Sequence, residues 1–402
     1  ECEWFEVRQD IDENIIKDIT KSLRIAFGIS YYKAFPTREI IVQNSTLDDA
    51  QKTFWQKFYK LGMWEFLFRN KINPEWLFNF ISTKAQDNKA NRDWKLSKKA
   101  LVPIWWWKDS CVAIEKIRNF WIDFDLFTFS SKDNQIFEDI QKASWNKRLF
   151  VKRQISPKLF ELNEAWYYNW HVPITWLISF VLILAAYLYD YKYIVLSNEH
   201  SADYGNLNYQ WMEVNHQYSK SFEFENDLRE YIKSYLSEDL EYFSILRDYY
   251  EVRIVKEFAK LKEYFPYFTS CNANFKVIKK WKNKRWCLDC PKCWFVFACL
   301  HPYINHDEMI EIFGDDMYED PNQKILFEEL LWISWHKPFE CVWTNEEIIL
   351  SMRYSYSSAD KQNLPYILKL FEKEILPKMT SKDFEELEKK LMDKYPNNIP
   401  NF

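Results

Sequence analysis

Short apolar runs alternate with helical patterns through the middle of the chain, and this alternation constrains the fold more than any other feature of the sequence. Four runs have the length and composition of buried strands: 100–104 (ALVPI), 125–130 (DLFTFS), 149–155 (LFVKRQI) and 193–197 (YIVLS). Helical patterns separate them at 111–119, 133–143 and 172–189. Strands that alternate with helices predict an α/β fold, in which a parallel sheet carries helices on both faces.

The sequence on either side of this region divides into further units. We expect an N-terminal α+β module at 1–95, the sheet domain at 96–265, a cysteine-rich segment at 266–305 and a helical C-terminal region at 306–402. Residues 220–264 have a charged, helical pattern. Apolar residues make up 48% of the chain, which is enough for a sizeable core and excludes extended disorder. The formal net charge of −5 argues against nucleic acid as a partner.

One segment has the length of a membrane span. Residues 172–189 carry no charged side chain over 18 positions, which meets the threshold for a spanning helix. Pro173 suits the first turn of a helix and Asp190 ends the run, so we favour a buried helix over a single-span membrane protein. No signal-peptide pattern is visible, and we expect a cytoplasmic protein without stable membrane insertion.

The loop after the first predicted strand has the position of a phosphate site but unsuitable side chains. Six residues form the loop and the start of the next helix: Trp105, Trp106, Trp107, Lys108, Asp109 and Ser110. Main-chain amides at a helix N-terminus attract anions, provided that small residues let the anion approach. Three successive indoles would stand between those amides and any ligand. Asp109 and Ser110 alone would be an ordinary helix cap.

The composition suggests an explanation for this conflict. The chain has 4 glycines, about 1% of its residues where about 7% is ordinary, and 20 tryptophans. Tryptophan stands at several places where a loop normally has glycine: Trp94, Trp170, Trp294, Trp332 and Trp343. We hypothesise that many tryptophans are glycines in the natural protein, because some genetic codes read the codon UGA as glycine. The alternative is a truly tryptophan-rich chain whose loop cannot bind phosphate. Trp55, inside an amphipathic helical pattern, is expected to be genuine.

Four of the eight cysteines have the spacing of metal ligands. Cys271, Cys287, Cys290 and Cys293 follow the pattern C-x15-C-x2-C-x2-C. Four thiolates at this density suit a structural Zn²⁺ site, which is often a closed cage of four cysteines. An iron–sulfur cluster is the alternative. Clustered cysteines of this kind also favour a reducing compartment over a disulfide scaffold.

With glycine at 105–107, the loop would read PIGGGKDS, which resembles the SGGxDS motif of the PP-loop ATPases. Four further strings follow in order: YIVLSNEHSADYGNL from 193, VNHQYSKS at 214–221, CLDCPKCWFVFACLHPY at 287–303 and KPFECVWT at 337–344. Together they resemble the family of MurL-type, ATP-dependent UDP-N-acetyl-α-D-muramoyl-L-alanyl-L-glutamate epimerases, from the N-terminal module to about residue 350.

This resemblance implies a PP-loop sheet and an isomerase of peptidoglycan precursor synthesis. The family inverts the terminal L-glutamate of a UDP-muramoyl dipeptide, with ATP and Mg²⁺ required and AMP and pyrophosphate released. By resemblance, positions 105–107 with Lys108, Asp109 and Ser110 cradle the phosphates, and Asp109 holds Mg²⁺ directly or through water. The implied partner is this small-molecule substrate.

Polar side chains beyond the predicted strands are expected to bind the substrate, because ligands lie at the carboxyl ends of parallel strands. Five candidates follow such a strand: Asn198, Glu199, His200, Ser201 and Asn206. Three more, Asn215, Ser219 and Ser221, belong to a string dense in hydrogen-bonding side chains that suits a carboxylate or diphosphate, and Lys337 begins the family-like string at 337–344. The catalytic base stays open among His216, Lys220 and Cys341. A cysteine thiolate can remove an α-proton, as it does in cofactor-independent amino-acid epimerisation.

Two other functions agree with the same sequence features. One is a different PP-loop ATPase, such as a 7-cyano-7-deazaguanine synthase or a tRNA-modifying enzyme, since the former also combines a PP-loop with a cysteine-rich zinc site. The other is a non-catalytic protein that keeps the nucleotide-binding fold with a degenerate loop.

Overall fold

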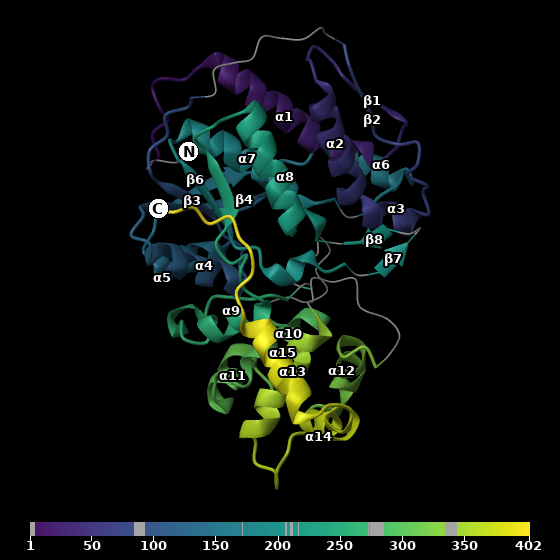
Figure 1. Ribbon diagram of the computed structural model, residues 1–402, viewed down its shortest axis with the longest axis vertical. Helices are drawn as coiled ribbons and strands as arrows, with labels where there is room; N and C mark the ends of the chain where they lie inside the picture. Colours follow the sequence, from purple (N-terminus) through teal and green to yellow (C-terminus); the bar gives the residue numbers. More distant parts are fainter. Residues whose placement is uncertain are drawn as a thin grey trace.

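A computed structural model describes most of the 402-residue chain. The described residues are 5–83, 93–170, 172–205, 207–209, 212–215, 217–271, 273, 285–333 and 344–402. The central sheet and the N-terminal elements form one half of the molecule, and helices α10 to α15 form the other half, with α9 at the junction (Figure 1).

A five-stranded sheet lies at the centre of the first half. Its strand order is β5-β4-β3-β6-β9, and every pairing is parallel. The strands are β3 (Ala100–Pro103), β4 (Phe124–Ser130), β5 (Arg148–Lys152), β6 (Tyr193–Leu196) and β9 (Glu241–Ser244). The parallel sheet predicted from the alternating pattern is therefore confirmed.

Strand β9 corrects one expectation. It lies within 220–264, which we expected to be helical throughout. The strand has only four residues, three of them buried, and charged helical segments precede and follow it. A run this short carries too little period-2 alternation to stand out from its surroundings. Its pairing with β6 supplies the hydrogen bonds that fix it as a strand.

Helices cover both faces of the sheet, as predicted. Ala100 and Val102 of β3 pack into a core with helices α4 (Lys108–Arg118), α5 (Gln135–Ser144) and α9 (Glu251–Phe258). Leu101, which points to the opposite face, belongs to a second core with α1 (Glu13–Tyr32), α7 (Ile174–Leu188) and α8 (Phe222–Tyr235). The alternation of side chains along a strand therefore divides the first half into two cores.

The uncharged segment at 172–189 forms the buried helix that we favoured. Helix α7 (Ile174–Leu188) has 15 residues, of which 11 are buried. Ser179, a buried polar residue of this helix, shares a hydrogen bond of 2.8 Å with Tyr242 of β9. Among the residues that the structure describes, no helix combines the length and the apolar character needed to cross a membrane.

Smaller elements complete the molecule. Beside the sheet lie the parallel pair β1 (Glu39–Val42) and β2 (Asn79–Ser82), the antiparallel pair β7 (Leu207–Tyr209) and β8 (Met212–Val214), and helices α2 (Asp49–Gly62), α3 (Trp64–Asn70) and α6 (Pro157–Glu164). The other half holds α10 (Pro291–Leu300), α11 (His306–Phe313), α12 (Lys324–Leu330), α13 (Asn345–Ser358), α14 (Tyr366–Glu374) and α15 (Ser381–Met392).

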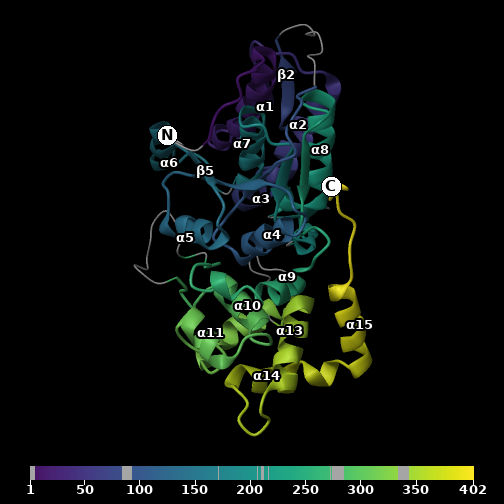
Figure 2. The same ribbon diagram turned by 90° about the vertical axis from the view of Figure 1, so that its left-hand side faces the viewer.

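The C-terminal tail connects the two halves a second time. After α15 it runs back along the molecule to the sheet (Figures 1 and 2). The ring of Phe402 lies 5.2 Å from that of Tyr193 on β6 and 5.9 Å from that of Phe243 on β9, measured between centroids. Aromatic pairs at this separation attract one another, so the tail helps to hold the helical half against the sheet.

Four tryptophans lie in the left-handed backbone region just after a helix ends. Their φ angles are positive: 57° at Trp121, 59° at Trp145, 63° at Trp166 and 57° at Trp332. They follow α4, α5, α6 and α12 respectively. Glycine normally occupies such helix-ending positions, because a side chain raises the energy of this conformation. Gly314, with a φ of 86°, ends α11 in this ordinary way.

Candidate active site

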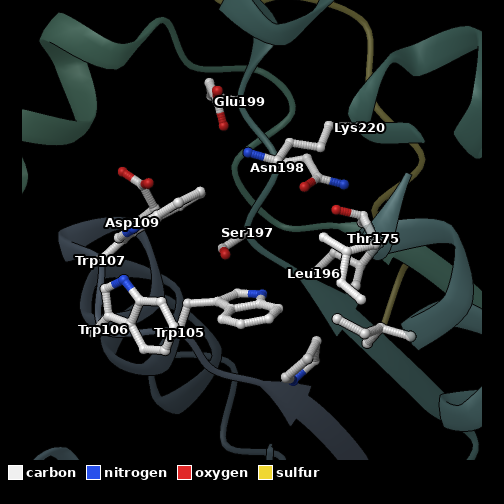
Figure 3. Close-up of a pocket in the computed structure, with 13 residues that line it drawn as sticks. Trp105, Trp106, Trp107, Asp109, Thr175, Leu196, Ser197, Asn198, Glu199 and Lys220 are labelled. Atoms are coloured by element: carbon white, nitrogen blue, oxygen red, sulfur yellow. The ribbon is translucent and has the colours of Figure 1, made fainter. Parts of the chain in front are cut away.

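A cavity of about 210 Å³ opens at the carboxyl ends of β3 and β6 (Figure 3). Its lining comes from the loop after β3, the start of α7, the end of β6 and the segment before α8. The lining residues are Pro103, Trp105, Trp106, Trp107, Asp109, Ile174, Thr175, Ile178, Leu196, Ser197, Asn198, Glu199 and Lys220. Ligand sites of α/β proteins lie at this edge of the sheet.

The loop at 105–107 forms one wall of the cavity and is tightly held. The amide of Trp105 donates a hydrogen bond of 2.9 Å to Ser110 Oγ, so the first turn of α4 closes back on the loop. The carbonyl of Trp106 accepts a hydrogen bond of 2.8 Å from the amide of Thr269. Trp107 is the N-cap residue of α4, and its side chain makes no capping bond. The loop therefore has the rigid strand-to-helix form of an anion site.

The indoles occupy the space that a ligand at this loop would need. All three tryptophans line the cavity, and the ring of Trp105 extends across it below Ser197 (Figure 3). The remaining volume is below the range of about 300–1,000 Å³ that is usual for small-molecule sites. With these side chains in place, the loop does not fit a nucleoside triphosphate. Glycine at 105–107 would open the cavity and expose the main-chain amides of the loop.

Three buried carboxylates gather beside the loop. Asp109, Glu199 and Glu251 each offer an oxygen within 4.8 Å of the others. Lys108, which is fully buried, places its Nζ 2.9 Å from Asp109 Oδ1 and also pairs with Glu251. Buried charges are stable only when paired, and the lysine partly neutralises this cluster. Carboxylate oxygens in this arrangement are the ligands that Mg²⁺ prefers.

Glu251 is a site residue that the sequence did not predict. It is the first residue of α9, which begins a few residues after β9. The signal for it was the strand β9 itself: a residue soon after a parallel strand lies at the same sheet edge as Asp109 and Glu199. Because the pattern at 220–264 predicts helix, it gives no strand end at which to expect Glu251.

Arg247 is a second missed residue, and it fixes the backbone of the cavity wall. Its guanidinium is fully buried and donates hydrogen bonds of 2.8 Å to the carbonyl of Glu199 and 2.7 Å to the carbonyl of Lys220. It also pairs with Glu225 at 3.1 Å. Two lining residues from separate segments are thus held by one cation, which keeps their side chains aimed at the cavity.

Glu347 is a third missed residue, and its hydrogen bonds join the two halves of the molecule. It belongs to the capping box of α13 and accepts bonds of 3.1 Å and 3.0 Å from the amide and hydroxyl of Thr344. Its other oxygen accepts bonds of 2.8 Å from Ser201 Oγ and 2.8 Å from the amide of Glu251. Burial raises the pKa of Glu347 to about 7. The T-x-x-E pattern at 344–347 was the available signal.

The predicted substrate residues separate into two groups. Asn198, Glu199 and the candidate base Lys220 line the cavity. The others that the structure describes are engaged elsewhere: His200 stacks on Tyr395 of the tail, Ser201 binds Glu347, Asn215 binds the carbonyl of Ala202, Ser219 is buried outside the lining, and Ser221 caps α8. Burial lowers the pKa of His200. Asn206, His216, Lys337 and Cys341 lie outside the described residues.

The four predicted cysteines come together, and their geometry fits a metal ion. Cys271, Cys287, Cys290 and Cys293 place their sulfur atoms within 4.8 Å of one another. Two of the separations are 3.7 Å (Cys287–Cys293) and 3.5 Å (Cys290–Cys293). A tetrahedral Zn²⁺ with bonds of about 2.3 Å requires sulfur atoms about 3.8 Å apart. Amides of Asp289 and Cys293 point at two of the sulfurs. The cluster can therefore hold a metal such as zinc.

Comparisons with known proteins agree with this arrangement of two halves. The MurL N-terminal domain matches residues 4–245 and the MurL C-terminal domain matches residues 267–385. A UDP-N-acetyl-alpha-D-muramoyl-L-alanyl-L-glutamate epimerase from Xanthomonas oryzae pv. oryzae is 33% identical over 92% of this chain and 81% of its own length. Epimerases of the same name from Micromonospora sp. and Salinispora tropica are 34% and 31% identical, over 83% and 88% of this chain and 74% and 76% of their own lengths.

The N-terminal match spans the whole central sheet and the loop at 105–107, and the C-terminal match spans the cysteine cluster and helices α10 to α14. The N-terminal domain precedes the C-terminal domain along the chain, and the relatives match over most of their lengths. On these grounds the chain belongs to the MurL family of UDP-N-acetyl-α-D-muramoyl-L-alanyl-L-glutamate epimerases.

Proposed function

We propose that this protein converts the terminal L-glutamate of UDP-N-acetyl-α-D-muramoyl-L-alanyl-L-glutamate to D-glutamate, in the cytoplasmic synthesis of peptidoglycan precursors. The observation that carries the proposal is the match of both MurL domains over nearly the whole chain. The cavity at the sheet edge supports it, because both domains contribute to the surroundings of one site: Thr269 binds the loop, and Glu347 binds the start of α9.

The chemistry requires activation of the substrate carboxylate. A free carboxylate barely acidifies the neighbouring C–H bond, since the carbanion would form beside a negative charge. In our proposal a carboxylate oxygen attacks the α-phosphorus of ATP, and the bond to pyrophosphate breaks. The resulting acyl-adenylate is neutral at the carbonyl, so a base can remove the α-proton. A proton then returns to the opposite face, and water hydrolyses the anhydride to release AMP and the D-glutamyl product.

The described residues supply most of the nucleotide side of this reaction. Backbone amides at 105–107 and the N-terminus of α4 are placed to bind the phosphates, with Ser110 fixing the loop. Asp109, Glu199 and Glu251 are the residues that would hold Mg²⁺, and the ion would neutralise charge on the phosphates. Asn198 and Thr175 line the same cavity and can donate hydrogen bonds to bound substrate.

This proposal needs glycine at positions 105–107. The indoles there close the cavity, whereas four other tryptophans occupy backbone conformations that suit glycine. Both observations support the hypothesis that many tryptophans of the sequence are glycines in the natural protein. The chain with tryptophan at 105–107 would be a non-catalytic protein with the same fold.

We propose Cys341 as the catalytic base that removes the α-proton, with His216 and Lys220 as alternatives. In the glycine-restored chain, Cys341→Ala should abolish exchange of the substrate α-proton with solvent deuterium. Undiminished exchange would remove Cys341 from the mechanism. We further propose that the cysteine cluster holds a structural Zn²⁺.

The test of the whole proposal uses the chain with Trp105, Trp106 and Trp107 replaced by glycine. It would be incubated with the UDP-muramoyl dipeptide, ATP and Mg²⁺, and the glutamate released by acid hydrolysis would be resolved by chiral chromatography. We expect D-glutamate in amounts that match the AMP and pyrophosphate formed. Nucleotide binding without epimerisation would instead favour another PP-loop activity, and a chain that binds no nucleotide would refute the proposal.

A further inference from the structure

The C-terminal tail, residues 393–402, contacts the first half of the molecule at more points than the ring of Phe402 (Figures 1 and 2). Asn398, which is half-buried, donates hydrogen bonds of 2.9 Å to Glu225 Oε1 and 2.8 Å to Asn226 Oδ1 in the first turns of α8. The proposed reaction does not use these contacts directly. The first of them, however, reaches a residue that supports the wall of the cavity.

Glu225 connects the tail to that wall through its ion pair with Arg247. Both side chains are buried, with exposed fractions of 1% for Glu225 and 0% for Arg247. Two nitrogens of the guanidinium bind Glu225 Oε2, each at 3.1 Å, whereas Asn398 binds Oε1. A buried ion pair is stable only when hydrogen bonds also satisfy its remaining polar atoms. Asn398 therefore helps to orient the carboxylate, and the carboxylate orients the guanidinium.

Arg247 in turn fixes two residues that line the cavity. Its guanidinium binds the main-chain carbonyls of Glu199 and Lys220. The peptide group that joins Glu199 to His200 is also held at its N–H, because the His200 amide donates a hydrogen bond of 2.8 Å to the carbonyl of Tyr249. A shift of the guanidinium would therefore tilt this peptide group and change the direction of the Glu199 side chain.

A second contact of the tail reaches the same peptide group. The ring of Tyr395 stacks on that of His200, with 4.0 Å between centroids and an angle of 23° between planes. Each ring covers one face of the other, and the burial of apolar surface favours this contact. The tail thus contacts the support of Glu199 twice: directly at His200 and, through the ion pair, at Arg247.

We propose that Asn398 is a positioning residue of the nucleotide site, which acts through Glu225 and Arg247 on the backbone of the cavity wall. The inference rests on the proposed use of Mg²⁺ and ATP, because Glu199 is one of the three carboxylates that would hold the ion. It gives the tail a role beyond packing. The tail starts at α15 in the helical half, so that half helps to set the geometry of a carboxylate at the sheet edge.

The first measurement needs no ligand. Asn398→Asp keeps the size of the side chain but replaces its donor group with a carboxylate oxygen, which repels Glu225. Hydrogen exchange, followed by mass spectrometry of peptides that cover 198–203, reports how often this segment opens. We expect exchange there to become about 2- to 12-fold faster, which corresponds to the loss of one hydrogen bond, while exchange in α1 and α11 stays the same.

Asn397→Asp is the matched control, since it makes the same change of charge one residue earlier. Asn397 is exposed, and its Oδ1 accepts a hydrogen bond of 3.1 Å from the amide of Ile399, which an aspartate also accepts. This variant should exchange like the parent, and Asn398→Ala repeats the measurement if Asn398→Asp does not fold. Unchanged exchange at 198–203, or equally faster exchange throughout the chain, would overturn the inference and leave the proposed function intact.

The second measurement places the same substitutions in the chain with glycine at 105–107. Binding of Mg²⁺-ATP and of adenosine is measured by isothermal titration calorimetry. Asn398→Asp should weaken Mg²⁺-ATP by a factor in the same range and leave adenosine unchanged, whereas Asn397→Asp should change neither. Faster exchange with unchanged affinity for Mg²⁺-ATP would remove Asn398 from the nucleotide site. A parent that does not bind Mg²⁺-ATP would refute the proposed function, and this inference with it.

Discussion

The tryptophans with positive φ allow a test of the glycine hypothesis that needs no substrate. Trp121, Trp145 and Trp166 follow helices α4, α5 and α6, and their side chains are 95%, 93% and 95% exposed. Replacing each with glycine therefore removes almost no buried surface. A left-handed backbone costs a residue with a Cβ about 1–2 kcal/mol, and glycine relieves that strain. Glycine also makes the unfolded chain more flexible, which lowers the free energy of unfolding by about 0.4–1 kcal/mol.

The net expectation is that each replacement stabilises the protein by about 0.5–1 kcal/mol. The assay is guanidinium unfolding of the single variants and of the triple variant. The midpoint should rise while the slope stays constant, because the surface exposed on unfolding hardly changes.

Trp55→Gly is the matched control, since it makes the same substitution at a fully buried position inside α2. Loss of the indole and of helix propensity should destabilise it by about 4–6 kcal/mol. If the three exposed replacements also destabilise the protein by more than 1 kcal/mol each, the conformational argument is wrong.

Three further results are expected. Burial raises the pKa of Glu347 to about 7 from 4.5, so the folded chain holds one more proton than the unfolded chain between these pH values. The free energy of unfolding should therefore fall as pH rises through this window, by about 3 kcal/mol in all, and Glu347→Gln should remove that slope in urea titrations at pH 5 and pH 8. Protein purified without oxygen should contain about one zinc per chain, since four cysteines complete one tetrahedral site; less than half an equivalent would contradict the zinc assignment. In the glycine-restored chain, Glu251→Gln should weaken binding of Mg²⁺-ATP but not of adenosine, and equal weakening of both would remove Glu251 from the cation site.

The features predicted correctly from the sequence are those that local patterns encode. The apolar runs ALVPI and YIVLS became neighbouring strands β3 and β6, because a buried parallel strand is apolar on both faces. The cysteine spacing identified a cluster that the structure brings together, since three of the four ligands lie within seven residues. Strand β9 was missed because its four residues sit between helical segments and draw their stability from pairing with β6.

The missed site residues have two causes. Arg247 and Glu251 follow β9 and were missed together with that strand, whereas Glu347 belongs to α13 and reaches Ser201 and Glu251 only because the helical half folds against the sheet. No local pattern records that approach. Glu347 carried a capping-box signal, but such a signal predicts a helix start and says nothing of the Ser201 hydroxyl and the Glu251 amide that also bind it.

The structure separates genuine tryptophans from those at glycine positions, and this division predicts the codon at each position. A genuine tryptophan should be buried with ordinary backbone and ordinary contacts, as Trp55 is. A glycine position should show one of two faults: a positive φ, as at Trp145, or a ring without room. Trp176 shows the second fault, because its ring centroid lies 3.4 Å from that of Phe58 at an angle of 68°, where aromatic pairs need about 4.5–7 Å.

We therefore expect UGA codons in the gene at positions 105–107, at the four positive-φ tryptophans and at Trp176, and UGG at Trp55. The codon used at each position is an observation separate from the geometry of the structure. Agreement between codon and geometry at all of these positions would therefore not arise by chance. Sequencing the gene and measuring the intact mass of the native protein would check both the codon and the residue inserted. UGG at the positive-φ positions would mean that the protein tolerates strained tryptophans there, and UGG at positions 105–107 would make the closed loop its natural state.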